Sequence, residues 1–457
     1  MPRAGFLALR RARPLWLQRN LVCLFAGRGM RSFSLGYINV IFAVYLAKEG
    51  YSAAQLGILF TAGAVISAVL TAAVGMLADR WGRKPFLIIF PVFTALASVV
   101  YGLTTSFFLV LAASGISGIG RGGGAGGGGG GGAYFPAEQA LITEQCDPRN
   151  RTTVFATLSF IGTLAAASGG LVALVPDLLM RDFGLGVAAA YRPLFWLTAI
   201  LGLATALVVL PVDERHRPAA AGSRRSWFPR RSAGLVVKLS ITNAFNGFGF
   251  GFFSSFIAYW LYRRYGASTG EIGVLFTVVN LSSATPYLLS SRLSRSLGAV
   301  RTILITRLFA VLTLALWPLM PTFLFASLFY VLRMTFNGLA MPVRQSYVMG
   351  IAPPEERSGV AGLTAIATMA PSSVSPSLSG YIMQNVSLNL PFECSAACQL
   401  VSAVLYYFFF RRILPPEEEE RARSLFAAAS VRAAGSPGVE PEVRVAYDPA
   451  AQQRTSL

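Results

Sequence analysis

The sequence predicts an all-α polytopic membrane protein in which twelve transmembrane helices form two pseudo-symmetric six-helix bundles. Three observations lead to this fold class: the composition, the recurrence of apolar segments and an internal repeat. Of the 457 residues, 54% are hydrophobic and only 13% are charged, about half of the roughly 25% that is typical of soluble domains. Backbone groups inside a bilayer must hydrogen-bond internally, so the apolar segments are expected to be helices and not open strands.

Long apolar segments recur along most of the chain. Residues 86–103 and 194–210 are two of them, and each approaches the length of about 20 apolar residues that a membrane-spanning helix needs. The twelve predicted spans are centred near residues 35, 66, 95, 115, 163, 201, 248, 282, 311, 334, 367 and 402. An even number of spans places both ends of the chain on the same side of the membrane.

Short motifs of the first half return in the second half. The sequence GILFT at 57–61 matches GVLFT at 273–277, an offset of 216 positions, and FPAEQ at 135–139 matches MPVRQ at 341–345, an offset of 206. Glu138 and Arg344 occupy equivalent places in this second pair of motifs. The chain is therefore expected to be two copies of a six-helix unit, an arrangement found in many secondary transporters.

The change in offset locates an insertion of about ten residues in the first half. The interval contains a run with ten glycines in the eleven positions 122–132. Without this run, span four already has enough apolar length, so the extra residues must make the helix protrude, tilt or break. Two readings stay open: a packing face or hinge, and a tolerated low-complexity expansion.

The predicted organisation follows from these segments and from the polar stretches between them. Residues 1–19 form a basic N-terminal tail, and residues 213–234 form a linker rich in Arg, Pro, Ala and Ser. The two bundles are expected over residues 20–212 and 235–413. The polar tail, residues 414–457, lacks the apolar content for a core and is expected to be disordered.

The net charge of +19 is distributed as in a membrane protein and does not indicate nucleic-acid binding. Arginines gather in the N-terminal tail, in the 213–234 linker and after spans two, eight and twelve, whereas the opposite loops contain few. Positive residues favour the cytoplasmic side, so both termini, the linker and the tail are expected to be cytoplasmic. We expect a multi-pass protein of the plasma membrane.

The segment GMLADRWGRK at 75–84 resembles the signature between helices two and three of the major facilitator superfamily, in its drug-efflux-like prokaryotic branch. The resemblance covers about residues 20–413 and implies a conformational latch formed by Gly75, Asp79, Arg80, Gly82 and Arg83. Glycines allow a tight turn, and Asp79 could pair with Arg83 or face a helix N-terminus. The alternative is that the basic residues only fix the topology.

Two departures from the family pattern weaken an assignment to drug:proton antiport. The place of the helix-four arginine is taken by Ser114, ahead of Gly118 and Gly120, which are expected to serve helix packing. Arg121 lies seven residues further on, near the same helix face. The antiporter motif of helix five is represented by AAASGG at 165–170, which has no proline.

Ionisable and amide side chains inside spans are candidates for the transport site, because burying them in a bilayer is costly. By the resemblance, helices one, four, seven and ten line the central cavity. The candidates on these helices are Arg31, Glu138, Asn243, Asn246, Arg333, Asn337 and Arg344. Glu138 is the expected proton carrier and could face Arg31 or Arg344, the alternative being a structural ion pair. For the arginines, including Arg28, the alternative is snorkelling to the head groups.

These features predict a secondary active transporter that moves a small organic solute by alternating access, with proton-coupled efflux as the first hypothesis. Uptake or exchange of an organic anion is the alternative, and a non-transporting sensor is a third. No phosphate-binding loop of the Walker type is present, and no enzyme activity, cofactor or metal site is expected. The expected partners are the substrate, the proton and the lipid bilayer, and the protein is expected to be a monomer that does not bind nucleic acid.

Overall fold

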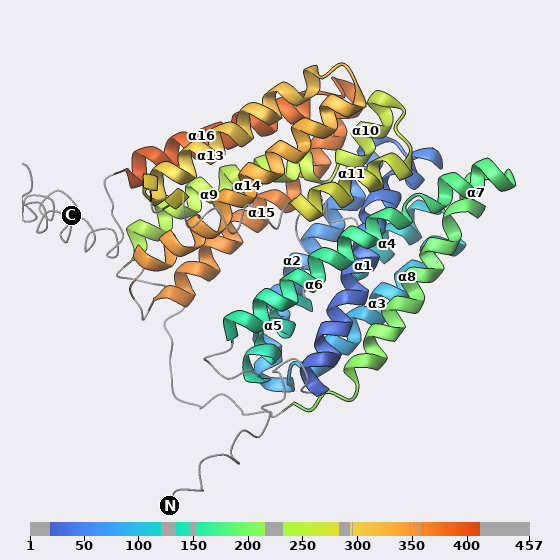
Figure 1. The fold of residues 1–457 in the computed structure, drawn as a ribbon, viewed down its shortest axis with the longest axis horizontal. Coiled ribbons are helices and arrows are strands. Elements are labelled where there is room, and N and C mark those ends of the chain that lie inside the picture. Colours follow the sequence, from blue (N-terminus) through green and yellow to red (C-terminus); the bar gives the residue numbers. More distant parts are fainter. Residues whose placement is uncertain are drawn as a thin grey trace, which may run out of the picture.

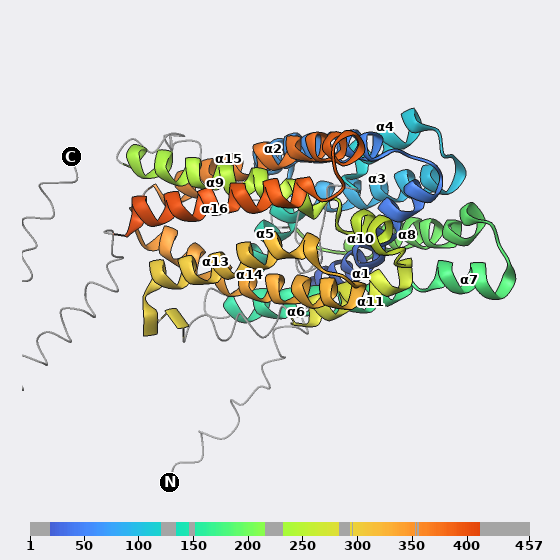
Figure 2. The same ribbon diagram turned by 90° about the horizontal axis from the view of Figure 1, so that it is seen from above.

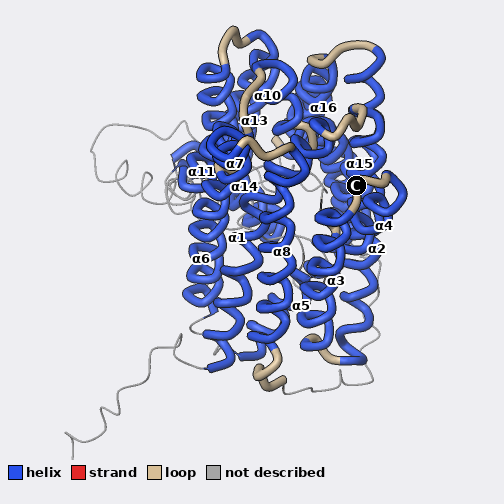
Figure 3. The backbone as a smooth tube through the Cα atoms, turned by 90° about the vertical axis from the view of Figure 1, so that its right-hand side faces the viewer, coloured by secondary structure: helices blue, strands red, loops and turns tan. Residues whose placement is uncertain are grey.

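The computed structural model describes residues 19–119, 134–145, 151–214, 232–282, 293–294, 296–351, 353 and 356–411, and this part of the chain is helical (Figure 3). The helices of the N-terminal half are α1 (Arg19–Lys48), α2 (Ala53–Trp81), α3 (Lys84–Leu103), α4 (Phe107–Ser117), α5 (Tyr134–Gln145), α6 (Arg151–Val172), α7 (Val175–Phe183) and α8 (Val187–Val209). Those of the C-terminal half are α9 (Ala233–Ser254), α10 (Ile257–Tyr265), α11 (Thr269–Ser282), α13 (Ala299–Leu316), the 3-10 helix η3 (Trp317–Leu319), α14 (Phe323–Ile351), α15 (Arg357–Asn385) and α16 (Leu390–Phe410).

The length and composition of these helices suit a bilayer. Eight stretches of the described chain are long and apolar enough to cross a membrane, and α4 and α11 are shorter apolar helices. Large apolar side chains such as Phe108 and Leu324 are more than three-quarters exposed on the outside of the bundle, as lipid-facing positions are expected to be. The predicted class, an all-α polytopic membrane protein, is confirmed.

The internal repeat is visible in the backbone. Gly82 ends α2 with φ 86° and ψ 166°, and Gly298 precedes α13 with φ 80° and ψ 156°. These two glycines are 216 positions apart, the offset of the first repeated motif. This region of backbone conformation is essentially restricted to glycine, so both halves need glycine at the same turn.

The most extensive contacts between the two halves are those of α2 with α15 and of α6 with α11, and α1 and α7 also contact the C-terminal half. Figure 2 shows these pairs on opposite sides of the molecule. At the first crossing, a Cβ on Gly57 would lie 2.6 Å from the Pro376 carbonyl oxygen. At the second crossing, a Cβ on Gly273 would likewise lie too close to the Gly170 carbonyl oxygen. Residues without side chains allow helix backbones to meet in this way.

The hydrogen bonds between described residues of the two halves gather toward one end of the molecule. They involve residues 54–61 and 167–191 of the N-terminal half and residues 269–277 and 374–384 of the C-terminal half. We call this the closed end. Away from it, the helices of the two halves diverge (Figure 1), and the opposite end is called the open end.

The fourth predicted span consists of two helices. Gly118 takes a left-handed conformation with φ 66°, and its backbone N–H donates to the Ser114 carbonyl oxygen, which ends α4. The next described helix, α5, begins at Tyr134. The structure therefore gives Gly118 a role in ending a helix, and its predicted packing role stays a prediction. Gly120, Arg121 and the glycine run 122–132 lie outside the described residues.

Candidate transport site

A buried ion pair joins α1 and α5 in the N-terminal half. The Nη1 atom of Arg28 lies 2.9 Å from Oε2 of Glu138, and the two residues are 4% and 0% exposed. The Arg28 guanidinium also lies 5.7 Å from the centroid of the Phe135 ring. An isolated charge is costly to bury in this environment, so each charge of the pair lowers the free-energy cost of burying the other.

The second oxygen of the Glu138 carboxylate does not take part in the ion pair with Arg28. Oε1 of Glu138 is buried and accepts no hydrogen bond from any described residue. A buried polar atom without a partner costs free energy, and a carboxyl oxygen becomes a donor when it binds a proton. Glu138 is thus held by Arg28 on one side, while its other oxygen remains available for a proton.

Arg31 lies one turn beyond Arg28 on α1 and faces the residue one turn before Glu138 on α5. The Arg31 guanidinium carbon is 4.5 Å from the centroid of the Tyr134 ring, a cation–π contact. Within the described residues, the carboxylate salt-bridges Arg28 and not Arg31 or Arg344, which corrects the expectation for the partner. Arg31 still acts electrostatically on Glu138.

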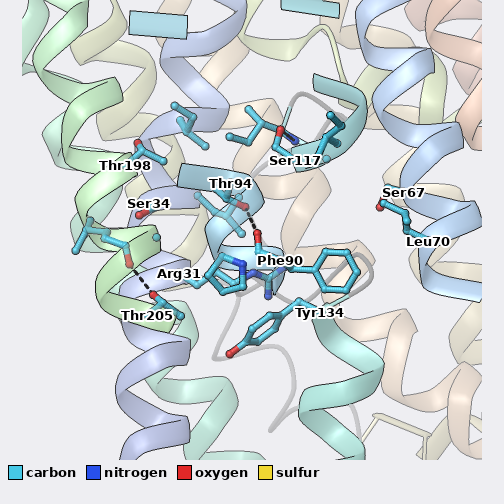
Figure 4. Close-up of a pocket in the computed structure, with 18 residues that line it drawn as sticks. Arg31, Ser34, Ser67, Leu70, Phe90, Thr94, Ser117, Tyr134, Thr198 and Thr205 are labelled. Atoms are coloured by element: carbon cyan, nitrogen blue, oxygen red, sulfur yellow. Dashed lines mark hydrogen bonds between the residues drawn. The ribbon is translucent and has the colours of Figure 1, made fainter. Parts of the chain in front are cut away.

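A small cavity with both polar and apolar side chains in its lining lies beside Arg31, inside the N-terminal half (Figure 4). Its volume is about 60 Å³, which suits a few water molecules and is far below the several hundred Å³ of a typical ligand pocket. The polar side chains in its lining include Arg31, Ser34, Ser67, Thr94, Tyr134, Thr198 and Thr205. Several hydroxyls are already bonded to their own helix, as Thr205 is to the Leu201 carbonyl oxygen.

In the C-terminal half, Arg333 is held within its own bundle. Its Nη1 donates to the Ala310 carbonyl oxygen at 2.7 Å and its Nη2 to Oε1 of Gln399 at 3.1 Å. Its guanidinium carbon lies 4.2 Å from the Phe253 ring centroid. These contacts link α9, α13, α14 and α16, so they explain how the bundle tolerates a buried cation, and a cavity role for Arg333 stays a prediction.

The remaining candidates of this half differ in burial. Asn243 is 8% exposed and donates to the Thr364 carbonyl oxygen at 3.3 Å. Asn246 and Arg344 are half-buried, and Asn337 is exposed. Among the described residues, none of these four side chains forms a hydrogen bond or ion pair with Arg31 or Glu138, and their roles in transport stay predictions.

The sequence reading missed a half-buried cation next to Arg344. Arg307 of α13 repels Arg344 electrostatically, donates through Nη1 to the Ser402 hydroxyl at 3.3 Å and lies 5.5 Å from the Tyr406 ring centroid. An arginine in the middle of the apolar stretch 303–317 was the available signal. In the described part of the chain, no carboxylate forms a salt bridge with Arg307, Arg333 or Arg344.

The segment predicted as a latch is tied to its own half by two acidic residues. Glu214 caps α3, because its two carboxylate oxygens accept from the backbone N–H groups of Arg83 and Lys84 at 2.6 and 3.0 Å. The Arg83 side chain forms an ion pair with Glu144. The predicted pairing of Asp79 with Arg83 stays a prediction. The structure describes the backbone of Gly75, Asp79 and Arg80 within α2 and not their side chains.

Helices that span a bilayer, arranged in two repeated halves with charged side chains buried inside them, define a membrane transporter built from paired bundles. A family model for the Major Facilitator Superfamily matches residues 24–238 and again residues 239–444. The chain belongs to the Major Facilitator Superfamily. The members of this family are transporters rather than enzymes, and this protein is likewise a transporter.

Three comparisons show the extent of the likeness. Uncharacterized membrane protein YJR124C of Saccharomyces cerevisiae is 23% identical over 409 residues, which cover 80% of this chain and 88% of that protein. Multidrug resistance protein MdtG of Escherichia fergusonii is 24% identical over 312 residues, 65% of this chain and 71% of that protein. The inward-facing, unoccupied crystal structure of a bacterial homolog of the human lysosomal transporter Spinster has a TM-score of 0.68 at 17% identity, covering 87% and 97% of the two chains.

Proposed function

We propose that this transporter exports small organic solutes in exchange for protons, by alternating access, as a monomer in the plasma membrane. The observation that carries the proposal is the Arg28–Glu138 pair, in which a buried carboxylate has one oxygen without a hydrogen-bond partner among the described residues. Protonation at that oxygen removes the negative charge that holds Arg28. The N-terminal half would then have two arrangements of α1 and α5, one for each protonation state.

The orientation follows from the distribution of arginines. The described residues Arg19, Glu214 and Ser232 lie at the open end and flank, in the sequence, the basic N-terminal tail and the basic linker. Positive residues therefore favour placing that end in the cytoplasm. In this orientation the closed end is extracellular and the structure corresponds to an inward-facing state. The Spinster homolog, whose fold is similar, is also described as inward-facing.

The efflux role is supported by relatives that are named as multidrug resistance proteins, such as MdtG. A second candidate, transport of an organic anion, is favoured by a different observation. Arg307, Arg333 and Arg344 are cations in the C-terminal bundle without a carboxylate salt bridge among the described residues. An anionic substrate would supply the missing negative charge during its passage.

The test uses purified protein in proteoliposomes with an imposed pH gradient. Ethidium, a lipophilic cation, and benzoate, an aromatic anion, represent the two substrate classes. Glu138→Gln should abolish gradient-driven transport and leave substrate exchange intact, because the variant cannot release a proton. Glu393→Gln, at an exposed position of α16, is the matched control and should behave as wild type. Full driven transport by Glu138→Gln would refute the assignment of the proton carrier.

A further inference from the structure

At the closed end, a carboxylate of the N-terminal half caps a helix of the C-terminal half. Asp177 of α7 accepts from the backbone N–H of Gly270 through Oδ2 at 2.6 Å and from the Thr269 hydroxyl through Oδ1 at 3.0 Å. Both donors belong to the first turn of α11. The positive end of the helix dipole strengthens such contacts when the acceptor is charged, so the charge of Asp177 holds the two halves together.

The hydroxyl in this contact is oriented by a further residue. The hydroxyl oxygens of Thr269 and Tyr191 lie 3.4 Å apart. The single hydroxyl proton of Thr269 is donated to Asp177, so Tyr191 is the donor in this second bond. A chain of hydrogen bonds therefore runs from α8 through α11 to α7, and it ends on the carboxylate.

At the pseudo-symmetric position in the other pair of helices, a neutral side chain accepts a single hydrogen bond from the first turn of a helix. The backbone N–H of Ala54, in the first turn of α2, donates to Oε1 of Gln384 on α15 at 3.1 Å. Ala54 and Gly270 are 216 positions apart, the offset of the repeat. Each half thus caps a helix of the other half, once with an amide and once with a carboxylate, and only the carboxylate can respond to pH.

The charges around Asp177 come from several elements. Lys48 of α1 attracts it electrostatically, and the Lys48 ammonium lies 5.5 Å from the Tyr191 ring centroid and 5.9 Å from that of Tyr262. Asp177 acts electrostatically on Lys48 and on Tyr191. Arg181 and Asp182 follow it on α7, and Glu271 directly follows Gly270 on α11. Glu271 points to the start of its own helix, where its carboxylate accepts from the Ser268 N–H.

We propose that Asp177 is a proton-binding residue of the gate at the closed end, separate from Glu138. Binding of a proton converts its charge-assisted hydrogen bonds to neutral ones and turns this crossing into a copy of the Ala54–Gln384 contact. The closed end then separates more easily, so acid on that side favours the outward-facing state. This inference rests on the proposed alternating-access cycle, and its test measures conformation and not transport.

The test places two spin labels across the closed end of the full-length protein in lipid nanodiscs, with the four cysteines replaced by serine. Phe183 of the N-terminal half and Val386 of the C-terminal half are suitable sites, being 74% and 66% exposed. Distances are measured by pulsed electron spin resonance from about pH 7 to about pH 3, a range that extends below the ordinary aspartate pKa of about 3.9. In the wild type, the separated population should grow as the pH falls.

Asp177→Asn should raise the separated population about five- to tenfold at neutral pH, since charged hydrogen bonds are roughly twice as strong as neutral ones. In the Glu138→Gln background, where the proposed proton carrier cannot titrate, it should also remove the response to pH. Gln384→Glu should have the opposite effect, a smaller separated population at neutral pH and a steeper response to acid. Asp182→Asn, a half-exposed acid of the same helix, is the matched control and should follow the wild type.

Several outcomes would overturn the proposal. A wild-type distance distribution that does not change with pH would do so, as would an acid response that survives in the double variant Asp177→Asn/Glu138→Gln. If Asp177→Asn does not fold, the wild-type titration and Gln384→Glu still decide the matter. Glu138→Gln should keep the acid response of the gate, so failure of this gate and failure of the proposed proton carrier are separate results.

Discussion

Arg28 and Glu138 form their ion pair entirely within the N-terminal half, with 2.9 Å between Nη1 and Oε2 and almost no exposure of either residue. Removal of one partner leaves the other charge buried and unpaired, at a cost of about 3–5 kcal/mol. Arg28→Met should therefore destabilise the protein strongly. The double variant Arg28→Met/Glu138→Leu should recover most of the loss. Thermal unfolding in detergent measures both, and equal or larger destabilisation of the double variant would contradict the assignment.

The glycine crossing between α2 and α15 can be tested with two glycines of one helix. A Cβ on Gly380 would lie 3.0 Å from the Cα of Gly57 and closer still to the Ala53 carbonyl, whereas a Cβ on Gly362 would have no neighbour within 4 Å. Gly380→Ala should lower the stability by about 1–3 kcal/mol through overpacking and should expose the closed end to a cysteine reagent. Gly362→Ala should be neutral or gain up to about 1 kcal/mol.

The turn at Gly82 should not accept a side chain. Its backbone lies in a region where other residues are strained by about 1–3 kcal/mol, and a Cβ would lie 2.9 Å from Oε2 of Glu214. Gly82→Ala is expected to lower the melting temperature, as is Gly298→Ala at the equivalent turn. Gly234→Ala, where a Cβ meets nothing within 4 Å, is the control, and an equal loss there would contradict the explanation from backbone strain.

Glu214 should matter for the same segment through its charge. Glu214→Gln keeps the size of the side chain but weakens two hydrogen bonds at the start of α3, and loss of a helix cap costs about 0.5–2 kcal/mol. The expected result is a modest loss of thermal stability in detergent. Glu393→Gln, an exposed acid near the start of α16, provides the comparison and should leave the melting temperature unchanged.

The glycine run can be tested by deletion of residues 122–131. If the run is a tolerated insertion, this deletion restores the spacing of the second half, and transport should stay near normal. If it is a hinge or packing face, the deletion should impair transport, and replacement of several glycines by leucine should impair it further. Transport at the wild-type rate in the leucine variant would exclude the functional reading.

Much of the fold could be predicted from the sequence because the bilayer imposes simple rules. Apolar length, arginine distribution and two repeated motifs were sufficient for the class and for the relation between the halves. The repeat even placed Gly82 and Gly298 at equivalent turns, which the backbone angles bear out. Span four could be recognised as overlong, but the sequence could not say that a left-handed Gly118 ends α4.

The partners of the charged side chains could not be predicted in the same way, because they depend on how each helix is rotated about its axis. Arg28 and Arg31 are three residues apart on one helix, and only the packing of α1 against α5 decides which one reaches Glu138. Glu214 is 131 positions from Arg83, and Asp177 is 93 from Gly270. No local sequence pattern indicates a helix cap that is supplied by a residue so far along the chain.

The two glycine crossings have a mechanical consequence. Gly57 of α2 meets Gly380 of α15, and Gly170 of α6 meets Gly273 of α11. Figure 2 shows these two pairs of helices on opposite sides of the molecule. The two points of backbone contact serve as pivot points, and the line through them is an axis about which one half can rotate against the other. Both pivot points lie near one end of their helices. Helix α2, for example, has 29 residues, which at about 1.5 Å each give a length of some 40 Å. Each half therefore extends only a short distance from this axis at the closed end and a long distance toward the open end. A small displacement at the closed end is accompanied by a larger displacement at the open end.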